Sequence, residues 1–194
     1  MPVAIAPWSA AWSGEQSFSV DPSTDFPGLL ELNQKQALGV GTPLFGAMNA
    51  TRLRRGMVDL LCHVCGKQTV RQDRYIFPVA SGGLVTLQDG LQQYGCNVPP
   101  MHRACALRAS HASPHLSKVS EPPLRCARDE GRLIYRTDVT PGLEAIAAAL
   151  PQGVDVVRSC YRLYGDAFTA KVMGARKAWE TTTLTRRATR GGRA

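Results

Sequence analysis

The sequence lacks any run of about 18 consecutive apolar residues, the length that a membrane-spanning helix needs. Its opening stretch, MPVAIAPWSAAWSGEQ, has no basic segment and only a short apolar run, so it does not resemble a signal peptide. We therefore expect a cytoplasmic protein without membrane contact. In that reducing compartment, the six cysteines are expected to be metal ligands or buried thiols rather than disulfides.

Aromatic residues are scarce, at 7 % of the chain, whereas 18 glycines and 13 prolines supply many turns. This composition predicts a small α+β fold with short helices and many loops. Catalytic motifs are missing as well. The sequence has no G-x-S-x-G nucleophile elbow, no phosphate-binding glycine-rich loop and no H-x-E element of a zinc deaminase. We therefore expect a protein that is not an enzyme.

Two cysteines in the stretch LLCHVCGKQT, Cys62 and Cys65, have the C-x-x-C spacing of a zinc knuckle. The best second pair is His102 and Cys105 in MHRAC. At positions i and i+3 of a starting helix, these two side chains point in the same direction. Four Cys/His ligands leave no open coordination position for water, so the pattern predicts structural Zn²⁺ rather than catalytic zinc. A knuckle followed by a hairpin and a helix start predicts a treble-clef-like module.

Other cysteines and histidines leave alternatives open. Cys96 or His115 could replace one of the four ligands, and His63 inside the knuckle is expected to point away from the metal. Cys126 and Cys160 are expected to be single buried thiols, the common state of an isolated cysteine.

Two catalytic alternatives also remain. An HNH-like nuclease would need an Asp–His pair that binds a metal and activates water; His111 and His115 with Asp73 are the available residues. A Cys–His dyad such as Cys96 with His111 is the second alternative, because spatial neighbours are invisible in a sequence.

The hydrophobic pattern predicts a helix after residue 49, capped by Asn49 or Thr51, with its arginines on the solvent face. The other expected elements are a hairpin of 74–80 with 82–88, a helix from Pro99–Pro100 to Pro114, a strand near 133–135, a helix after Thr140 and a helix over 154–180. The expected organisation is an extended N-terminal arm (1–50), a zinc-binding module (51–128), an α/β or helical C-terminal part (129–180) and a disordered basic tail (181–194).

Positive charge is concentrated in two blocks. Residues 51–128 carry eleven basic and four acidic side chains, and residues 176–194 carry six and one, within a net charge of +8. Clustered basic charge is typical of proteins that bind polyanions, so we expect DNA or RNA as a partner, with a protein partner as the alternative. The arginines expected to contact phosphates are Arg52, Arg54, Arg55, Arg71, Arg74, Arg103 and Arg108, helped by arginines of the tail.

Two stretches resemble a known group of proteins. PLFGAMNATRLRRGMVDLLCHVCGKQT and VPPMHRACALRASHASPHL resemble uncharacterised zinc-knuckle proteins of Streptomyces, related actinobacteria and their phages. The resemblance covers residues 42–68 and 98–116 and supports the metal site. His102 stands where the pattern of that group has a cysteine, which leaves a competent ligand set with one negative charge fewer. Since the group has no assigned activity, the resemblance leaves the function open.

Overall fold

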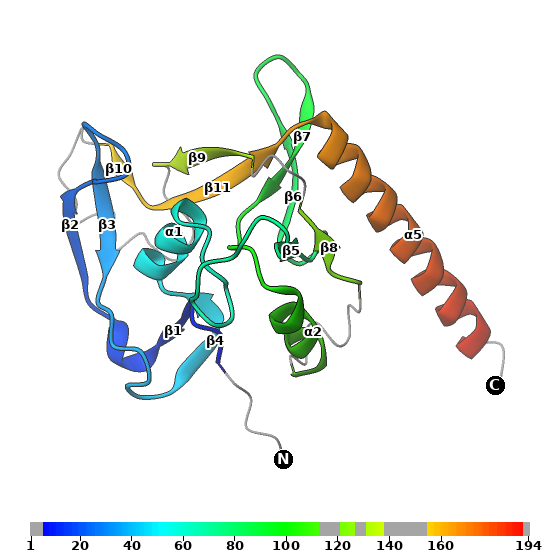
Figure 1. Ribbon diagram of the computed structural model, residues 1–194, viewed down its shortest axis with the longest axis horizontal. Helices are drawn as coiled ribbons and strands as arrows, with labels where there is room; N and C mark the ends of the chain where they lie inside the picture. Colours follow the sequence, from blue (N-terminus) through cyan, green and yellow to red (C-terminus); the bar gives the residue numbers. More distant parts are fainter. Residues whose placement is uncertain (1–5, 113–120, 127–130, 138–154, 192–194) are drawn as a thin grey trace.

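The computed structural model describes residues 6–112, 121–126, 131–137 and 155–191. It shows a mixed α+β fold in which helices and small β-sheets surround two buried clusters (Figure 1). The strands are β1 (Ala10–Trp12), β2 (Phe18–Pro22), β3 (Leu30–Gln34), β4 (Pro43–Met48), β5 (Tyr75–Ile76), β6 (Gly82–Thr86), β7 (Gln92–Cys96), β8 (Leu124–Arg125), β9 (Arg132–Arg136), β10 (Val156–Val157) and β11 (Ser159–Tyr164). The helices are the short 3₁₀ helix η1 (Ser13–Glu15), α1 (Ala50–Val58), α2 (Arg103–Ala112) and α5 (Asp166–Gly191). The helix expected after Thr140 lies outside the described residues.

The first fifty residues form strands rather than the extended arm that the sequence predicts. β1 pairs with β4, and β2 pairs with β3, both antiparallel, while β10 adds to the other edge of β3 in parallel. α1 begins directly after β4, with Asn49 as its cap: the Asn49 side chain accepts the N–H of Arg52, as the capping pattern predicts. Since α1 packs against β3 and β11, these strands support the helix that leads into the C-x-x-C stretch.

Two arginines of α1 are buried, contrary to the prediction of a solvent-facing basic side. Arg52 has an exposed fraction of 1 % and donates two hydrogen bonds to Glu15, at 2.6 and 2.8 Å, while Glu15 is fully buried. Arg54 pairs with Glu31, with Nη2 to Oε1 at 2.9 Å. Each arginine is neutralised by a carboxylate of the N-terminal segment, Glu15 in η1 and Glu31 in β3, so burial is possible without an unpaired charge. These ion pairs tie α1 to the first fifty residues.

The Glu15 carboxyl has a lowered pKa, which makes stability depend on pH. Burial alone would raise this pKa, but hydrogen bonds from Arg52, from the backbone N–H groups of Ala37 and Trp12, and from Asn49 outweigh it and bring the pKa from 4.5 to about 2. A lowered folded-state pKa means that the stabilisation is complete above pH 4.5 and is lost as the pH falls from there towards 2. We expect the free energy of unfolding, measured with urea, to fall in this window.

Acid also protonates metal ligands, so the control for this prediction is a Glu15→Gln variant measured at the same pH values. The glutamine has no charge to lose. The difference in unfolding free energy between wild type and variant should therefore shrink steadily below pH 4.5. A difference that stays constant down to pH 3 would contradict the lowered pKa of Glu15.

A four-stranded antiparallel sheet, in the order β6-β7-β11-β9, forms the other half of the fold. The sequence predicts a hairpin of 74–80 with 82–88, but the structure shows that β6 pairs with β7, while β5 pairs with β8. The hairpin turn contains Asp89–Gly90, with Gly90 at a φ of 82°. Asp-Gly is a strong hairpin signal, and it identifies the correct pair of strands. The strand expected near 133–135 is confirmed as β9.

The segment after residue 155 forms two strands, β10 and β11, in place of the helix that the sequence predicts. The two strands belong to different sheets. Val156, Cys160 and Tyr164 recur every four residues, which indicates one face of a helix. A spacing of four is also a multiple of two, so the same residues share one face of an extended chain. All three are buried, in β10 and β11. The helix begins only at Asp166, after Gly165.

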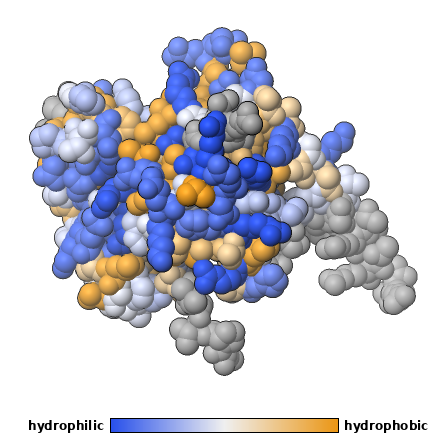
Figure 2. Space-filling model, viewed as in Figure 1, coloured by the Kyte–Doolittle hydropathy of each residue, from blue (hydrophilic) through white to orange (hydrophobic). Residues whose placement is uncertain are grey.

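α5 packs onto the body through its first turns. Phe168 and Val172 are buried beside Tyr94 and Tyr164, as the helical spacing predicts, and the helix then extends away from the body (Figure 1). It continues through Gly191, whereas the sequence predicts a disordered tail from 181. None of the described helices is long and apolar enough to cross a bilayer. On the face seen in Figure 2, hydrophobic residues are scattered among hydrophilic ones.

Candidate metal centre

The C-x-x-C stretch folds into a tight knuckle directly after α1. Leu61 and Gln68 form a β-bridge at its base. Within it, the Cys62 N–H donates to the Lys67 carbonyl at 2.7 Å, and the Gly66 N–H donates to the Cys62 carbonyl at 2.8 Å. Gly66 has a φ of 71°, a left-handed conformation that glycine adopts without strain. This turn places both cysteine side chains on the same side of the knuckle.

The N-terminal segment supports the knuckle from outside. The Trp8 ring lies against Gly66 so closely that a Cβ there would be 2.7 Å from it. The backbone N–H groups of Trp8 and Ser9 donate to the carbonyls of Val64 and His63, at 2.9 and 3.2 Å. His63 Nδ1 contacts the Ser9 hydroxyl, so this imidazole points away from the cysteines, as expected. Burial lowers the pKa of His63 to about 4, which keeps it neutral near pH 7.

Arg162 holds the end of α1 that leads into the knuckle. Its guanidinium, on β11, donates to the Met57 carbonyl from Nε and Nη2, at 2.8 and 2.6 Å, and to the Val58 carbonyl at 3.2 Å. A cation at a helix C-terminus satisfies carbonyls that have no intrahelical partner and interacts favourably with the helix dipole. β11 therefore fixes the position from which the knuckle departs.

The second pair of ligands comes from the start of α2. His102 immediately precedes the helix, and Cys105 lies in its first turn. The Asp73 carboxylate accepts the Arg103 N–H at 2.7 Å, and the Pro100 carbonyl accepts the His63 N–H at 2.9 Å. The helix begins at Arg103, later than the predicted start at Pro99–Pro100, because Met101 forms a β-bridge with Tyr75. These contacts hold the start of α2 against the knuckle.

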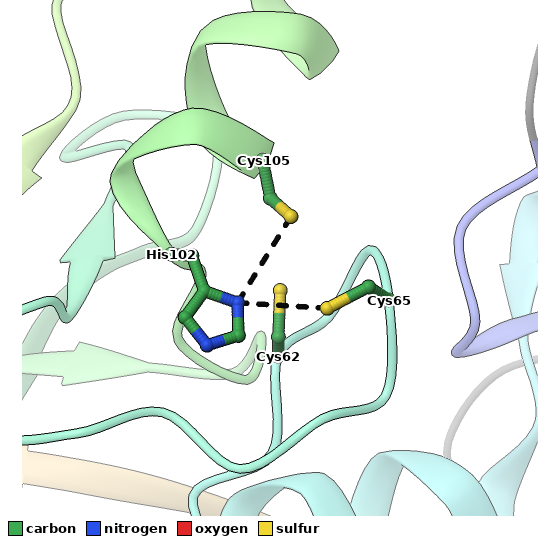
Figure 3. Close-up of side chains that lie close together, drawn as sticks. All are labelled: Cys62, Cys65, His102 and Cys105. Atoms are coloured by element: carbon green, nitrogen blue, oxygen red, sulfur yellow. Dashed lines mark hydrogen bonds between the residues drawn. The ribbon is translucent and has the colours of Figure 1, made fainter.

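The four expected ligands converge. The ligand atoms of Cys62, Cys65, His102 and Cys105 all lie within 4.8 Å of one another (Figure 3). His102 Nδ1 is 3.5 Å from the Cys65 sulfur and 4.0 Å from the Cys105 sulfur. Zinc bonds to sulfur and nitrogen at the usual lengths in a tetrahedron place these atoms about 3.6 Å apart. The cluster therefore has the size and the donor set of a site for a metal ion such as zinc.

The ring orientation of His102 is fixed by a hydrogen bond on its far side. His102 Nε2 lies 3.2 Å from the Gln68 carbonyl oxygen. A carbonyl can only accept, so Nε2 carries the proton and Nδ1 presents a lone pair to the cysteines. Such a partner for the second ring nitrogen is characteristic of metal-bound histidines.

The surroundings of the cluster shift the pKa values of two of its thiols in opposite directions. Burial raises the pKa of the Cys62 thiol to about 12, so a metal that binds there must displace its proton. The partly exposed Cys65 has a lowered pKa, because hydrogen bonds from the Lys67 backbone and the neighbouring ligands outweigh the effect of burial. Arg108 donates from Nη2 to the Cys105 sulfur at 3.2 Å. That guanidinium would offset part of the negative charge of the three thiolates that a bound metal requires.

The other cysteines and histidines that the sequence offers as alternative ligands or catalytic residues are not part of this cluster in the described residues. Cys96 belongs to the other buried cluster and contacts the Val98 carbonyl, so it is not a fifth member of the site. Cys126 and Cys160 are buried free thiols, as predicted. His111 contacts the Leu107 carbonyl from an exposed position, whereas His115 lies outside the described residues. Within the described part of the chain, the Cys62 quartet is the group of Cys, His, Asp and Glu side chains found close enough together to hold a metal.

The seven arginines predicted to contact phosphates divide into three groups. Arg52 and Arg54 are buried in ion pairs and do not face solvent, which corrects that prediction. Arg74 is half-buried and donates to Thr69. The exposed members are Arg55, Arg71, Arg103 and Arg108. Comparison of the chain with models of protein families, with curated proteins and with solved structures gave no match.

Proposed function

We propose that the Cys62 quartet holds a structural zinc ion and that the protein is a non-enzymatic, treble-clef-like module. The observation that supports this proposal is the convergence of three sulfurs and one nitrogen from two distant segments of the chain. Four protein ligands fill a tetrahedron, so no position remains for a catalytic water. The knuckle, the intervening strands and the start of α2 follow one another in the order of a treble clef, with the metal joining the first to the last.

We propose further that this module binds nucleic acid through its exposed cations. Between residues 60 and 112 the basic side chains are Lys67, Arg71, Arg74, Arg103 and Arg108, against Asp73 and Asp89. Asp73 is engaged in capping α2, which reduces its contribution to the surface charge. A surface with an excess of arginine attracts the phosphate backbone without reading sequence. The proposed binding to DNA or RNA is therefore electrostatic and does not depend on the base sequence.

The test is the salt dependence of binding to a fluorescent 20-base-pair DNA duplex and to a 20-nucleotide RNA. Each phosphate contact contributes about 0.9 to the slope of log K against log salt concentration on duplex DNA. An Arg71→Gln/Arg103→Gln variant should therefore weaken binding to all sequences alike and reduce the slope by about 2. Arg108 is left unchanged because it contacts the metal ligand Cys105.

The matched control is Arg132→Gln, which removes an exposed arginine from β9, outside the metal module. Its slope should equal that of the wild type. Absence of binding at 50 mM salt, or equal slopes for all three proteins, would contradict nucleic-acid binding by this surface. Neither outcome would affect the assignment of the metal.

A second candidate is a structural-zinc module that docks onto another protein. The observation that favours it is an open groove beside α5, away from the metal ligands.

A further inference from the structure

An open groove of about 490 Å³ lies between the four-stranded sheet and α5. One wall is strand β6 and the other is a stretch of the helix beyond its buried first turns. The lining residues are Gly83 and Leu84 on β6, and Met173, Arg176, Lys177 and Glu180 on α5. None of these residues belongs to the metal cluster, so the groove is a separate feature of the surface.

β6 is an edge strand. It pairs with β7, and no other strand among the described residues pairs with it. An edge strand carries a row of backbone N–H and C=O groups without partners, which is a template for another strand. Natural proteins often protect such edges with charged side chains or proline, but β6 has the sequence Gly-Gly-Leu-Val-Thr. Within the described part of the chain, β6 itself therefore carries neither a proline nor a charged side chain at its open edge.

The hydrogen bonds of β7 show which groups of β6 face outwards. Leu84 lies directly opposite Tyr94, and the Tyr94 N–H donates to the Thr169 hydroxyl at 2.9 Å instead of to β6. Opposite residues of an antiparallel pair exchange both hydrogen bonds or neither. The Leu84 N–H and C=O therefore point away from β7, towards the open edge. Consistently, the Leu87 N–H donates to the Leu91 carbonyl, so the alternate residues bond within the hairpin.

Side chains beside this edge are apolar and accessible. Leu84 shares the sheet face of Tyr94, which packs against Phe168 of α5, because opposite residues project to the same side. Leu84 and Met173 keep exposed fractions of 37 % and 39 %. An extended segment placed along β6 would cover both side chains while its backbone bonds with Leu84.

The helix wall adds a charge preference. Arg176 and Lys177 line the groove together with a single carboxylate, Glu180. Cations on the wall favour acidic side chains on the occupant and disfavour basic ones. A nucleic acid would satisfy the charges but could not form the strand-type backbone bonds that Leu84 offers.

We propose that the groove between β6 and α5 binds an extended, acidic segment of a partner protein, which adds as a strand to the β6 edge. Main-chain hydrogen bonds to β6 provide affinity, and the contacts with Leu84, Met173 and Lys177 provide selectivity. This proposal rests on the second candidate function, docking onto another protein, for which it names the class of partner, and it does not depend on nucleic-acid binding.

The test uses a phage library of random dodecapeptides as the probe and the full zinc-loaded chain as the target. We expect enrichment of sequences in which acidic and apolar residues alternate. The leading sequence, made as a labelled synthetic peptide, should bind Lys177→Glu about tenfold more weakly than the wild type, because attraction becomes repulsion. Lys171→Glu is the matched control: Lys171 is also exposed on α5 but contacts the Arg125 carbonyl outside the groove, so affinity should stay unchanged.

Strand addition has its own readout. Bound peptide should slow hydrogen exchange at the outward-facing amide of Leu84 and leave the amides within the hairpin unchanged. The proposal is overturned if no acidic sequence is enriched, if Lys177→Glu and Lys171→Glu bind equally well, or if binding leaves exchange at Leu84 unaltered. Enriched sequences that match a stretch of this chain would indicate a second copy as the occupant and would likewise contradict a partner protein.

Discussion

We expect a Cys62→Ala variant to lose the proposed metal ion and the folded metal module, and a Cys160→Ala variant to keep both. These cysteines are equally buried, with exposed fractions of 0 % and 1 %, and both substitutions remove only a thiol. Truncating a small core side chain costs about 1 kcal/mol. Structural zinc in finger peptides is worth about 10–16 kcal/mol, which matches or exceeds the whole stability of an ordinary domain. The loss of stability caused by Cys62→Ala should therefore be far larger than the loss caused by Cys160→Ala.

The measurements are bound metal per chain, circular dichroism and thermal unfolding of both variants beside the wild type. Addition of a strong chelator to the wild type should reproduce the Cys62→Ala result, because it removes the same ion. Equal thermal midpoints for the two variants would show that Cys62 is only a packed thiol. In that case a bound metal would not contribute to the stability of the fold.

Replacing Arg52 with Met should destabilise the protein by about 3–5 kcal/mol, the usual consequence of leaving a buried charge without its partner. Methionine fills the space of the arginine stem but leaves the Glu15 carboxylate, which is fully buried, without its two hydrogen bonds from the guanidinium. The double variant Arg52→Met/Glu15→Gln should recover a large part of this loss, because no buried charge remains. Urea unfolding of the three proteins measures the effect.

Arg55→Met is the control for this prediction. Arg55 lies on the same helix, but its ion pair with Asp59 is exposed and long, at 3.8 Å. Exposed pairs contribute about 0–1 kcal/mol, so the control should change stability little. If Arg52→Met proved as mild as Arg55→Met, the buried ion pair would not be what joins α1 to the N-terminal strands.

The metal cluster could be predicted from the sequence because its information is local. C-x-x-C followed by glycine specifies a knuckle, and H-x-x-C at a helix start places two ligands on one face. Only the contact between these two segments, the knuckle and the start of α2, depends on the tertiary fold. Asn49 as one of two candidate caps and the presence of a helix after the two prolines were predictable for the same reason, since caps and breakers act within a few residues. The start of α2 was predicted too early, because the helix begins at Arg103 rather than at the prolines.

The buried arginines could not be predicted, because their partners are distant. Nothing near Arg52 in the chain indicates burial; Glu15 neutralises it from 37 residues away. The strand β11 was missed because a four-residue spacing fits both a helix and a strand, and only pairing with β7 and β9 decides between them. The groove at β6 is likewise invisible in the sequence, since an edge exists only once a sheet has formed.

Native mass spectrometry and elemental analysis of the purified wild-type chain would decide whether the cluster holds a metal ion. Structural zinc in the Cys62, Cys65, His102 and Cys105 cluster predicts about one zinc ion per chain, which stays bound through purification. A folded chain whose mass shows no metal, and which unfolds at the same temperature with and without chelator, would show that the cluster holds no structural zinc.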